Sequence, residues 1–574
     1  MNQLSRIALV LVALAAMLVP PPAGAARKAK ELLQYIPADT PYVFAYTKSF
    51  PDDLQDRFEP AMEKTLSAYR RILRITLDDE LQKLRAAEDG AQEAERLEAL
   101  GEEVISLLSV QSLRDAGIGR DALFAVYGDG MLPVMRFALT DRDDFEATIA
   151  RLEERAGERL DVGSVDGLSY RYKDVDKLRL VIATPGRDTV VALVPPGYGD
   201  QRLARTLGLE KPRDNLHRSR TLRRIAREYG FTEHIGAFID VERLVAGFTG
   251  DPGGLNAELL QILGYDASAP TPECRAEFAE MAAIAPRVVM GYTRVSDDYL
   301  DTKLVVELRD DIAAGLATLS AAVPGLGTDP GGLVSFGFSL DPMALRNFYE
   351  ARLDAMEADP YECAKLAGLQ AGTVKGREAL AKPLPPVVYG FRGVLARVTD
   401  VRGMDLAAEK PPESIDAGVL FAVENVEALV AMAALMSPEI AAAKLLPDGK
   451  ARELNLPQLA EIAETAFAAL SEGALAVSLG ADAEQEAVAL LEAGVSDDPP
   501  FMSMAMDMKR YYGFIGDAMM AAGSEEGEEP MSEELRLAVR DTMVSSGEIY
   551  ERMSADVHLT ERGIEVGSRM TLAD

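Results

Sequence analysis

The feature that most constrains the fold of this chain is a series of strand and helix patterns that occurs twice. The stretch 323–332 is rich in turn-forming residues and marks a linker between the two series. Before it, Pro41–Tyr46 has the pattern of a strand that leads into a helix, and after it Leu333–Leu340 does the same, with Asp341 as the helix cap. Three more pairs follow in the same order: the strands 133–139 and 418–423, the strands 235–240 and 501–507, and the hairpins 288–308 and 549–572. We therefore predict a first repeat over 26–322 and a second over 333–574.

The strands of both series are short and are joined by tight turns, which favours antiparallel pairing. A long apolar pattern with helical spacing lies near 53–110 and is broken at Glu88–Gly90, so we predict a helical hairpin there. We expect its apolar stripe to pack on its own sheet rather than on a partner as a coiled coil. The predicted fold class is α+β, with two related halves, each a mainly antiparallel sheet with helices packed on one face. A single large α+β domain with unrelated repeating patterns is the alternative.

The N-terminus has the three parts of a secretion signal. A short basic start is followed by the apolar stretch Ile7–Val19, and the small residues of Ala23–Ala25 then form a cleavage pattern. A retained membrane anchor is the alternative, but that stretch reaches only ~20 Å as a helix, short of the ~30 Å hydrocarbon core. We predict a signal peptide over 1–25, a mature start near Ala26 and a periplasmic location. Since no later stretch has the same apolar character, we expect no transmembrane span after cleavage.

The chain has two cysteines, Cys274 and Cys363. In an oxidising compartment an exposed free thiol tends not to survive, so a disulfide between them is the interpretation that we favour. Two buried free thiols are the alternative, because the sequence does not establish that the two residues meet.

The chain carries 60 Lys and Arg residues against 93 Asp and Glu residues, a formal net charge of −33. This balance argues against a nucleic acid partner, because phosphate backbones require a basic surface. In one stretch of about three helical turns five arginines crowd together. They are Arg218, Arg220, Arg223, Arg224 and Arg227. Guanidinium groups bind phosphate and carboxylate, so these are candidate residues for binding an anion or an anionic surface. We favour the alternative of a solvated helix face whose arginines pair with acidic residues of the same chain.

The sequence predicts no catalytic, cofactor or metal site. Its three histidines, His217, His234 and His558, are too far apart in sequence for a paired-histidine zinc motif, and we interpret His234 and His558 as surface or strand residues. The glycine-rich spots lack the lysine and Ser/Thr of a phosphate loop, and the aspartate clusters lack the pattern of a calcium loop. We therefore expect no cofactor, and the sequence favours a protein that is not an enzyme.

One resemblance supports export. The stretch Tyr35–Ala45, with YIPADTPYVFA, resembles the mature start of exported bacterial proteins that are grouped as a domain of unknown function. The resemblance extends through Tyr127–Pro133 and Cys274–Phe278. It implies export and a shared fold, and it carries no active residue to this chain.

Two functional hypotheses follow. The first is an exported, non-catalytic envelope protein that binds an unidentified ligand or envelope partner between its two duplicated halves. The alternative is a periplasmic hydrolase that uses carboxylates without a recognisable motif.

Overall fold

The structure, a computed structural model, divides the chain into two compact units. It describes residues 25–86, 91–120, 122–249, 255–262, 264, 270–403, 412–455, 463–521 and 532–573. Unit 1 takes in residues 1–270, 287–297 and 531–549, and unit 2 takes in residues 271–286, 298–530 and 550–574. The chain is not divided at the linker 323–332 that the sequence predicts. The boundary between two repeats at this linker therefore remains a prediction. Most of the predicted signal peptide, residues 1–24, lies outside the described residues.

The strands of unit 1 form an antiparallel sheet in the order β4-β5-β6-β7-β3-β2-β1-β8-β9. Their bounds are β1 (Tyr42–Tyr46), β2 (Phe124–Asp129), β3 (Leu132–Ala138), β4 (Asp161–Val165), β5 (Leu168–Val175), β6 (Leu178–Ala183), β7 (Asp188–Val194), β8 (Ile235–Asp240) and β9 (Arg287–Val295). The antiparallel pairing predicted from the tight turns is therefore confirmed for this sheet.

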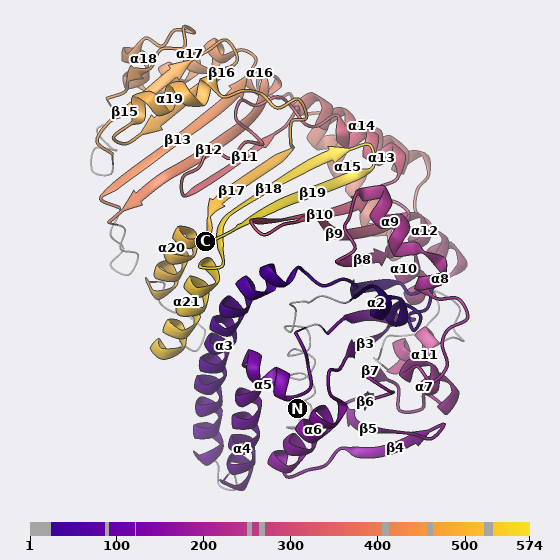
Figure 1. The fold of residues 1–574 in the computed structure, drawn as a ribbon. Coiled ribbons are helices and arrows are strands. Elements are labelled where there is room, and N and C mark those ends of the chain that lie inside the picture. Colours follow the sequence, from indigo (N-terminus) through magenta and orange to yellow (C-terminus); the bar gives the residue numbers. More distant parts are fainter. Residues whose placement is uncertain are drawn as a thin grey trace. The chain divides into compact units, whose positions relative to one another are not determined.

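The helices of unit 1 are α2 (Ala25–Leu33), α3 (Asp52–Ala86), α4 (Ala91–Leu107), α5 (Val110–Asp115), α6 (Arg142–Ala156), α7 (Asp200–Leu207), α8 (Leu216–Ser219), α9 (Thr221–Tyr229), α10 (Val241–Thr249), α11 (Leu255–Ile262) and α21 (Glu533–Gly547). Helices α3 and α4 lie side by side in the region of the predicted helical hairpin (Figure 1). Helix α21 packs along α3, where Arg71 pairs with Asp541 at 2.5 Å. This packing places α21, which we expected in the second repeat, in unit 1.

Helices cover both faces of the unit 1 sheet, not one face as the sequence predicted. Arg136 and Phe137 are consecutive on β3 and therefore point to opposite faces, yet both side chains are buried. Phe137 packs edge-to-face against Phe145 of α6 at 5.8 Å, and Arg136 donates to the carbonyl oxygen of Leu207, the last residue of α7, at 3.0 Å. The prediction failed because a strand buried on both faces loses the alternating pattern that one-sided burial produces.

The strands of unit 2 also form an antiparallel sheet, in the order β14-β15-β16-β13-β12-β11-β17-β18-β19-β10. Their bounds are β10 (Tyr299–Glu307), β11 (Val334–Ser339), β12 (Phe391–Arg402), β13 (Ser414–Val423), β14 (Arg452–Glu453), β15 (Ala466–Leu470), β16 (Ala474–Leu479), β17 (Met502–Asp507), β18 (Tyr550–Thr560) and β19 (Gly563–Leu572). Both units therefore combine helices with an antiparallel sheet, which confirms the α+β fold class.

The helices of unit 2 are α12 (Pro272–Ala282), α13 (Asp310–Ala317), α14 (Pro342–Ala358), α15 (Ala367–Leu380), α16 (Pro386–Tyr389), α17 (Val426–Met436), α18 (Pro438–Ala443), α19 (Ala483–Glu492) and α20 (Met508–Ala521). The core includes Leu420 of β13, Leu395 of β12, Leu326 and Leu490 of α19. No helix in the described ranges combines the length and the apolar character that crossing a membrane requires.

Aspartate and asparagine caps fix where the helices begin after the strands. The carboxylate of Asp341 accepts the N–H groups of Met343 and Ala344 at the start of α14, at 2.8 and 3.0 Å. Asp240 and Asp507, the last residues of β8 and β17, accept the N–H groups of Arg243 and Arg510, each at 2.9 Å. The caps lie at the positions that the sequence predicted.

The two cysteines of the chain are bonded to each other, as the sequence favoured. The disulfide links Cys274 of α12 to Cys363, which lies between α14 and α15 in unit 2. Both cysteines are buried beside Leu366, with Phe278 and Tyr361 packed against them. The bond therefore joins α12 to the α14–α15 connection through a small apolar cluster.

Candidate functional site

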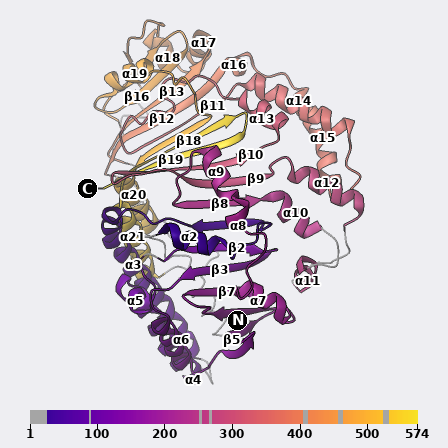
Figure 2. The same cartoon turned by 45° about the vertical axis from the view of Figure 1, so that its right-hand side comes forward.

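A cleft of about 780 Å³ opens on unit 1 where several segments meet. Its lining comes from α2, from the residues that follow β1, from α8 and α9, from the residues around the start of β8, and from the end of β9. Helices α2 and α8 lie side by side in front of the strands of this unit (Figure 2). The volume is in the range of pockets that hold small ligands, about 300–1,000 Å³.

The cleft forms at this place because β1 and β8 are antiparallel neighbours. Tyr46 at the end of β1 pairs with Ile235 at the start of β8, so the two flanking loops leave the sheet together. The N–H group of Thr47 donates to the carbonyl oxygen of His234 at 2.8 Å, and the Thr47 hydroxyl donates to that of Glu233 at 2.7 Å. These bonds hold Lys48 and Ser49 next to His234 at one wall of the cleft.

The cleft is basic in a chain with a net charge of −33. Lys30, Lys48, Arg223, His217 and His234 line it, against one acidic residue, Glu233, among the described lining residues. Within the described part of the chain, Lys30, Lys48 and Arg223 form no ion pair and their side chains donate no hydrogen bond. The pKa of His217 is lowered first by burial and then by the charges of Lys30, Arg223 and two neighbouring arginines. Uncompensated positive charge of this kind attracts an anion.

His234 is the most buried of the cleft's basic residues. Its imidazole lies 5.4 Å from the Phe50 ring between ring centroids, and its Nδ1 is 3.0 Å from the hydroxyl of Thr232. Burial, with a smaller contribution from the charge of Lys48, lowers its pKa to about 4. At neutral pH His234 is therefore uncharged, and the positive charge of the cleft comes from Lys30, Lys48 and Arg223.

The low pKa of His234 predicts a loss of stability in acid. The unfolded chain binds a proton at this residue near pH 6.5, whereas the folded chain binds it only near pH 4. Stability therefore falls as the pH drops through this window, by roughly 2–3 kcal/mol. His234→Phe removes this dependence, so the unfolding free energy of the wild type minus that of the variant should fall by this amount between pH 7.5 and pH 4. Guanidinium unfolding at several pH values measures it, and parallel profiles would contradict the assignment.

One buried hydroxyl beside the cleft lacks a hydrogen-bond partner among the described residues. Ser49 is 5 % exposed, and its Oγ forms no hydrogen bond within the described part of the chain. An unpaired polar atom in such a place costs about 1–3 kcal/mol of folding free energy. Because this Oγ has almost no accessible surface, it is not open to a ligand in the cleft.

The five arginines predicted as anion-binding candidates occupy different places. Arg223 lines the cleft, whereas Arg218, Arg220, Arg224 and Arg227 are exposed outside its lining. Arg218 and Arg220 still act on His217, whose pKa they lower. None of the five forms an ion pair with a described carboxylate, so the pairing with acidic residues that we favoured from the sequence is absent from the described ranges.

Sequence reasoning missed the other residues of the cleft. Lys30, Lys48 and Ser49 were not singled out, and His234 was interpreted as a surface or strand residue, although it is buried just before β8. A usable signal exists in the strand pairing, because Lys48 follows one predicted strand and His234 precedes another. Only the adjacency of those two strands brings the residues together.

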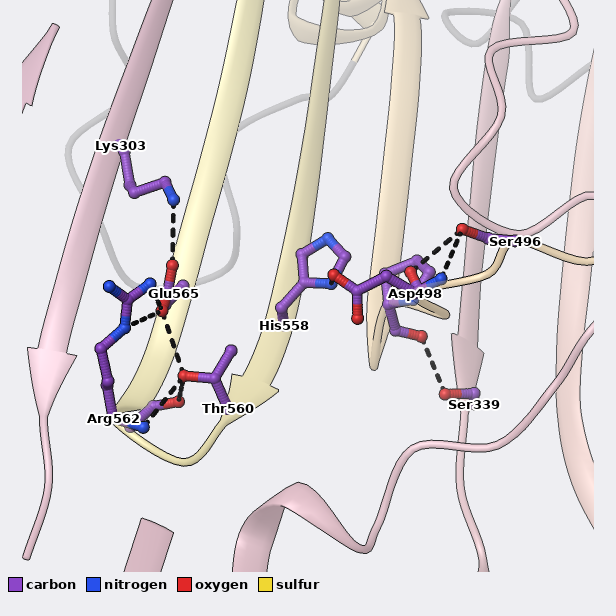
Figure 3. A network of polar contacts seen from close by, with 10 residues as sticks. Lys303, Ser339, Ser496, Asp498, His558, Thr560, Arg562 and Glu565 are labelled. Carbon is purple, nitrogen blue, oxygen red and sulfur yellow. Dashed lines mark hydrogen bonds and ion pairs between the residues drawn. The ribbon is translucent and has the colours of Figure 1, made fainter. Parts of the chain in front are cut away.

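One end of the unit 2 sheet holds a serine, a histidine and an aspartate, but they do not form a catalytic triad. Ser339 is fully buried and donates to the carbonyl oxygen of Pro500 at 2.8 Å, while it accepts the N–H of Ala321 at 3.2 Å. His558 approaches Asp498 with Nδ1 at 3.5 Å from the carboxylate, and the Ser339 hydroxyl points to the Pro500 carbonyl instead of to this histidine (Figure 3). Among the residues that the structure describes, no general base is hydrogen-bonded to this hydroxyl.

A second network of polar side chains in unit 2 is centred on Glu565 of β19. The carboxylate of Glu565 accepts hydrogen bonds from Lys303 at 3.0 Å and from Arg562 at 2.6 Å, and the Thr560 hydroxyl donates to it at 3.1 Å (Figure 3). These hydrogen bonds, with the two positive charges, outweigh burial and lower the pKa of Glu565. The network joins β10, β19 and the turn between β18 and β19.

The hydrolase hypothesis requires two carboxylates in one pocket. A pocket of about 360 Å³ in unit 2 contains Asp341 and Glu424, but Arg392 pairs with both of them. Asp341 also caps α14. Neither carboxylate is therefore free to act as a base, and this pocket gives the hypothesis no support.

Comparisons of the chain with protein-family models, with curated proteins and with solved structures find no match. The described residues contain no group of three or more His, Cys, Asp and Glu side chains arranged to hold a metal ion. The resemblance to exported bacterial proteins stays a prediction.

Proposed function

We propose that this chain is an exported bacterial envelope protein that acts by binding, without catalysis, and that its ligand is an anion held in the basic cleft of unit 1. The observation that carries the proposal is the convergence of Lys30, Lys48 and Arg223, all without ion-pair partners in the described chain, on one cleft of a strongly acidic protein. A ligand site between two halves, as the sequence suggested, stays a prediction.

We further propose that the two units descend from one duplicated module. Hydrogen bonds at equivalent strand ends support this. In unit 1 the N–H of Thr47 donates to His234 and its hydroxyl donates to Glu233, at 2.8 and 2.7 Å. In unit 2 the N–H of Ser339 donates to Phe501 and its hydroxyl donates to Pro500, each at 2.8 Å.

The strand orders support the same proposal. Reading β7-β3-β2-β1-β8-β9 in unit 1 against β16-β13-β12-β11-β17-β18 in unit 2 aligns strands that occur in the same order along the chain. The registers agree as well, because Tyr46, Phe124 and Phe137 follow one another across unit 1 as Phe338, Val394 and Phe421 do across unit 2.

The proposed modules differ where the ligand would bind. In unit 1 the segment between β7 and β8 contains α7, α8 and α9 and so supplies His217 and Arg223, whereas the segment between β16 and β17 contains α19. In unit 2 Phe501 stands at the position of His234, and Leu340 at that of Lys48. The proposal therefore assigns anion binding to unit 1 alone.

Export to the periplasm is part of the proposal. Its support is the N-terminal pattern of a basic start, an apolar stretch and a small-residue cleavage motif, together with the disulfide between Cys274 and Cys363. Detection of the mature chain from Ala26 in a periplasmic fraction tests it, and a chain that keeps residues 1–25 in the cytoplasm would overturn it.

Binding of inorganic phosphate, measured by calorimetry at low ionic strength, tests the ligand assignment. We expect Arg223→Gln to weaken binding by about 10- to 100-fold, because it removes a charge-assisted hydrogen bond that is worth about 1.5–3 kcal/mol. Arg224→Gln is the matched control, since Arg224 is the next residue on the same helix and lies outside the cleft lining. Equal losses in the two variants would indicate a general surface charge effect, and no binding to the wild type would remove the proposal.

A further inference from the structure

We infer that the cleft of unit 1 takes an amphiphilic anion, a phosphate or carboxylate group attached to an apolar chain, in preference to a small hydrophilic anion. This inference rests on the proposed function and specifies the chemistry of its ligand. It comes from the second kind of residue in the cleft lining, the apolar side chains, which a small anion would leave in contact with water.

Apolar side chains line the cleft beside the cations. Leu33, Ala226 and Val295 are half-buried, and Pro51 is exposed. All four side chains line the open cleft and do not belong to the buried core. Leu222 is buried behind them and packs directly on β8, where Gly236 leaves room: a Cβ there would lie 3.2 Å from each Leu222 methyl group. The cleft therefore has an apolar wall built from α2, α9 and β9.

The cations lie on the same elements as the apolar wall. Lys30 is one helical turn before Leu33 on α2, and Arg223 is three residues before Ala226 on α9, so each cation and its apolar neighbour share a helix face. Lys30, Arg223 and His217 line the same cleft, and the charges of Lys30 and Arg223 lower the pKa of His217. A ligand whose charge lies among these three side chains can extend its apolar part along Leu33 and Ala226.

Size and charge select this ligand class. A phosphate or carboxylate group alone fills a small part of about 780 Å³ and leaves the apolar wall wet. An uncharged apolar molecule would leave the positive charges of Lys30, Lys48 and Arg223, which are exposed, without a counter-ion and would gain nothing from them. An amphiphilic anion satisfies both parts of the cleft.

Calorimetry with three probes tests the inference: inorganic phosphate, monooctyl phosphate below its micelle concentration, and octyl glucoside. We expect monooctyl phosphate to bind at least about 30-fold more tightly than phosphate, since each buried methylene contributes about 0.8 kcal/mol and only part of the chain needs to be covered. Octyl glucoside should not bind measurably. Arg223→Gln should weaken the binding of monooctyl phosphate. Val295→Thr and Ala226→Leu should reduce the ratio of the affinity for monooctyl phosphate to the affinity for inorganic phosphate.

The outcomes separate the two proposals. Equal affinity for phosphate and monooctyl phosphate would overturn the amphiphile and leave the anion site in place. No binding of either anion would overturn the proposed function itself. Equal binding of octyl glucoside, or binding to phosphatidylglycerol vesicles without binding to dispersed monooctyl phosphate, would also overturn the inference. A rise in the pKa of His217 on binding, followed by NMR, is the expected signature of the anion beside it, and an unchanged pKa would place the anion elsewhere.

Discussion

Reduction of the Cys274–Cys363 disulfide is expected to lower the free energy of unfolding of unit 2 by about 4 kcal/mol. The bond closes a loop with a sequence separation of 89 residues. Opening a loop of this length restores to the unfolded chain a conformational entropy worth about 4–5 kcal/mol at 25 °C on the chain-entropy model. Guanidinium unfolding with and without reductant measures the effect, and coincident transitions would contradict it.

The double variant Cys274→Ser, Cys363→Ser controls for effects of the reductant and should match the reduced wild type. A second contact holds the same two segments together, so the predicted loss of stability should come from the missing cross-link and not from separation of the segments. The Glu277 carboxylate accepts the N–H groups of Glu362 and Cys363 at 2.6 and 3.0 Å, so α12 stays attached to the α14–α15 connection in the native state. The reduced protein should therefore fold and lose stability, and the His217 and His234 resonances of unit 1 should not shift.

Strand positions and helix caps could be predicted from the sequence because both are local. The alternation of residues gives β1, β3, β8 and β17 to within a few residues, and an aspartate after a strand predicts the start of the next helix. Antiparallel pairing follows from short connections. These features depend on neighbours along the chain, and tertiary packing did not overrule them.

The buried face of β11 could not be predicted. Alternation along this strand suggests that Val334, Phe336 and Phe338 face the core, yet Phe336 is 45 % exposed and Ser335 and Ser339 are buried. The small residues are on the inside because Leu326 and Leu395 pack where a larger side chain would stand. A Cβ on Gly337 would lie 2.7 Å from the Leu326 side chain. Leu326 lies in the loop before β11, and its packing decides which face of the strand is buried. The residue pattern within the strand carries no information about that loop.

In the candidate site, too, the local features could be predicted from the sequence and the tertiary ones could not. Arg223 was accessible to sequence reasoning because the arginines beside it form a local charge cluster. Lys30 and Lys48 lie far from it along the chain and meet it only through the pairing of β1 with β8 and the placement of α2. His234 is closer in sequence, but nothing local indicates that it turns towards the same cleft. Lys30, Lys48 and Arg223 lack ion pairs within the described ranges because of where the acidic residues fold, which composition alone does not report.

Arg136 is the second position where we expect a large effect. Its side chain is fully buried, pairs with Asp188 at 3.4 Å and lies 4.0 Å from the centroid of the Tyr35 ring. Burial already raises the pKa of Asp188, against the opposing charge of Arg136. Removing that charge leaves the half-buried Asp188 carboxylate without its ion-pair partner and also removes the buried hydrogen bond to Leu207, so Arg136→Met should cost about 3–5 kcal/mol at pH 7.

The pH dependence and a compensating variant test whether this cost is electrostatic. In Arg136→Met the folded-state pKa of Asp188 lies still further above its unfolded value, so protonation favours the folded state and the deficit should shrink as the pH falls from 7 towards 4. Adding Asp188→Leu should recover most of the lost stability, because an apolar pair carries no buried charge. Arg155→Met, at an exposed position, is the matched control and should cost less than about 1 kcal/mol. A deficit that neither acid nor Asp188→Leu reduces would mean that Arg136 stabilises unit 1 through its packing on Tyr35 and its bond to Leu207 instead.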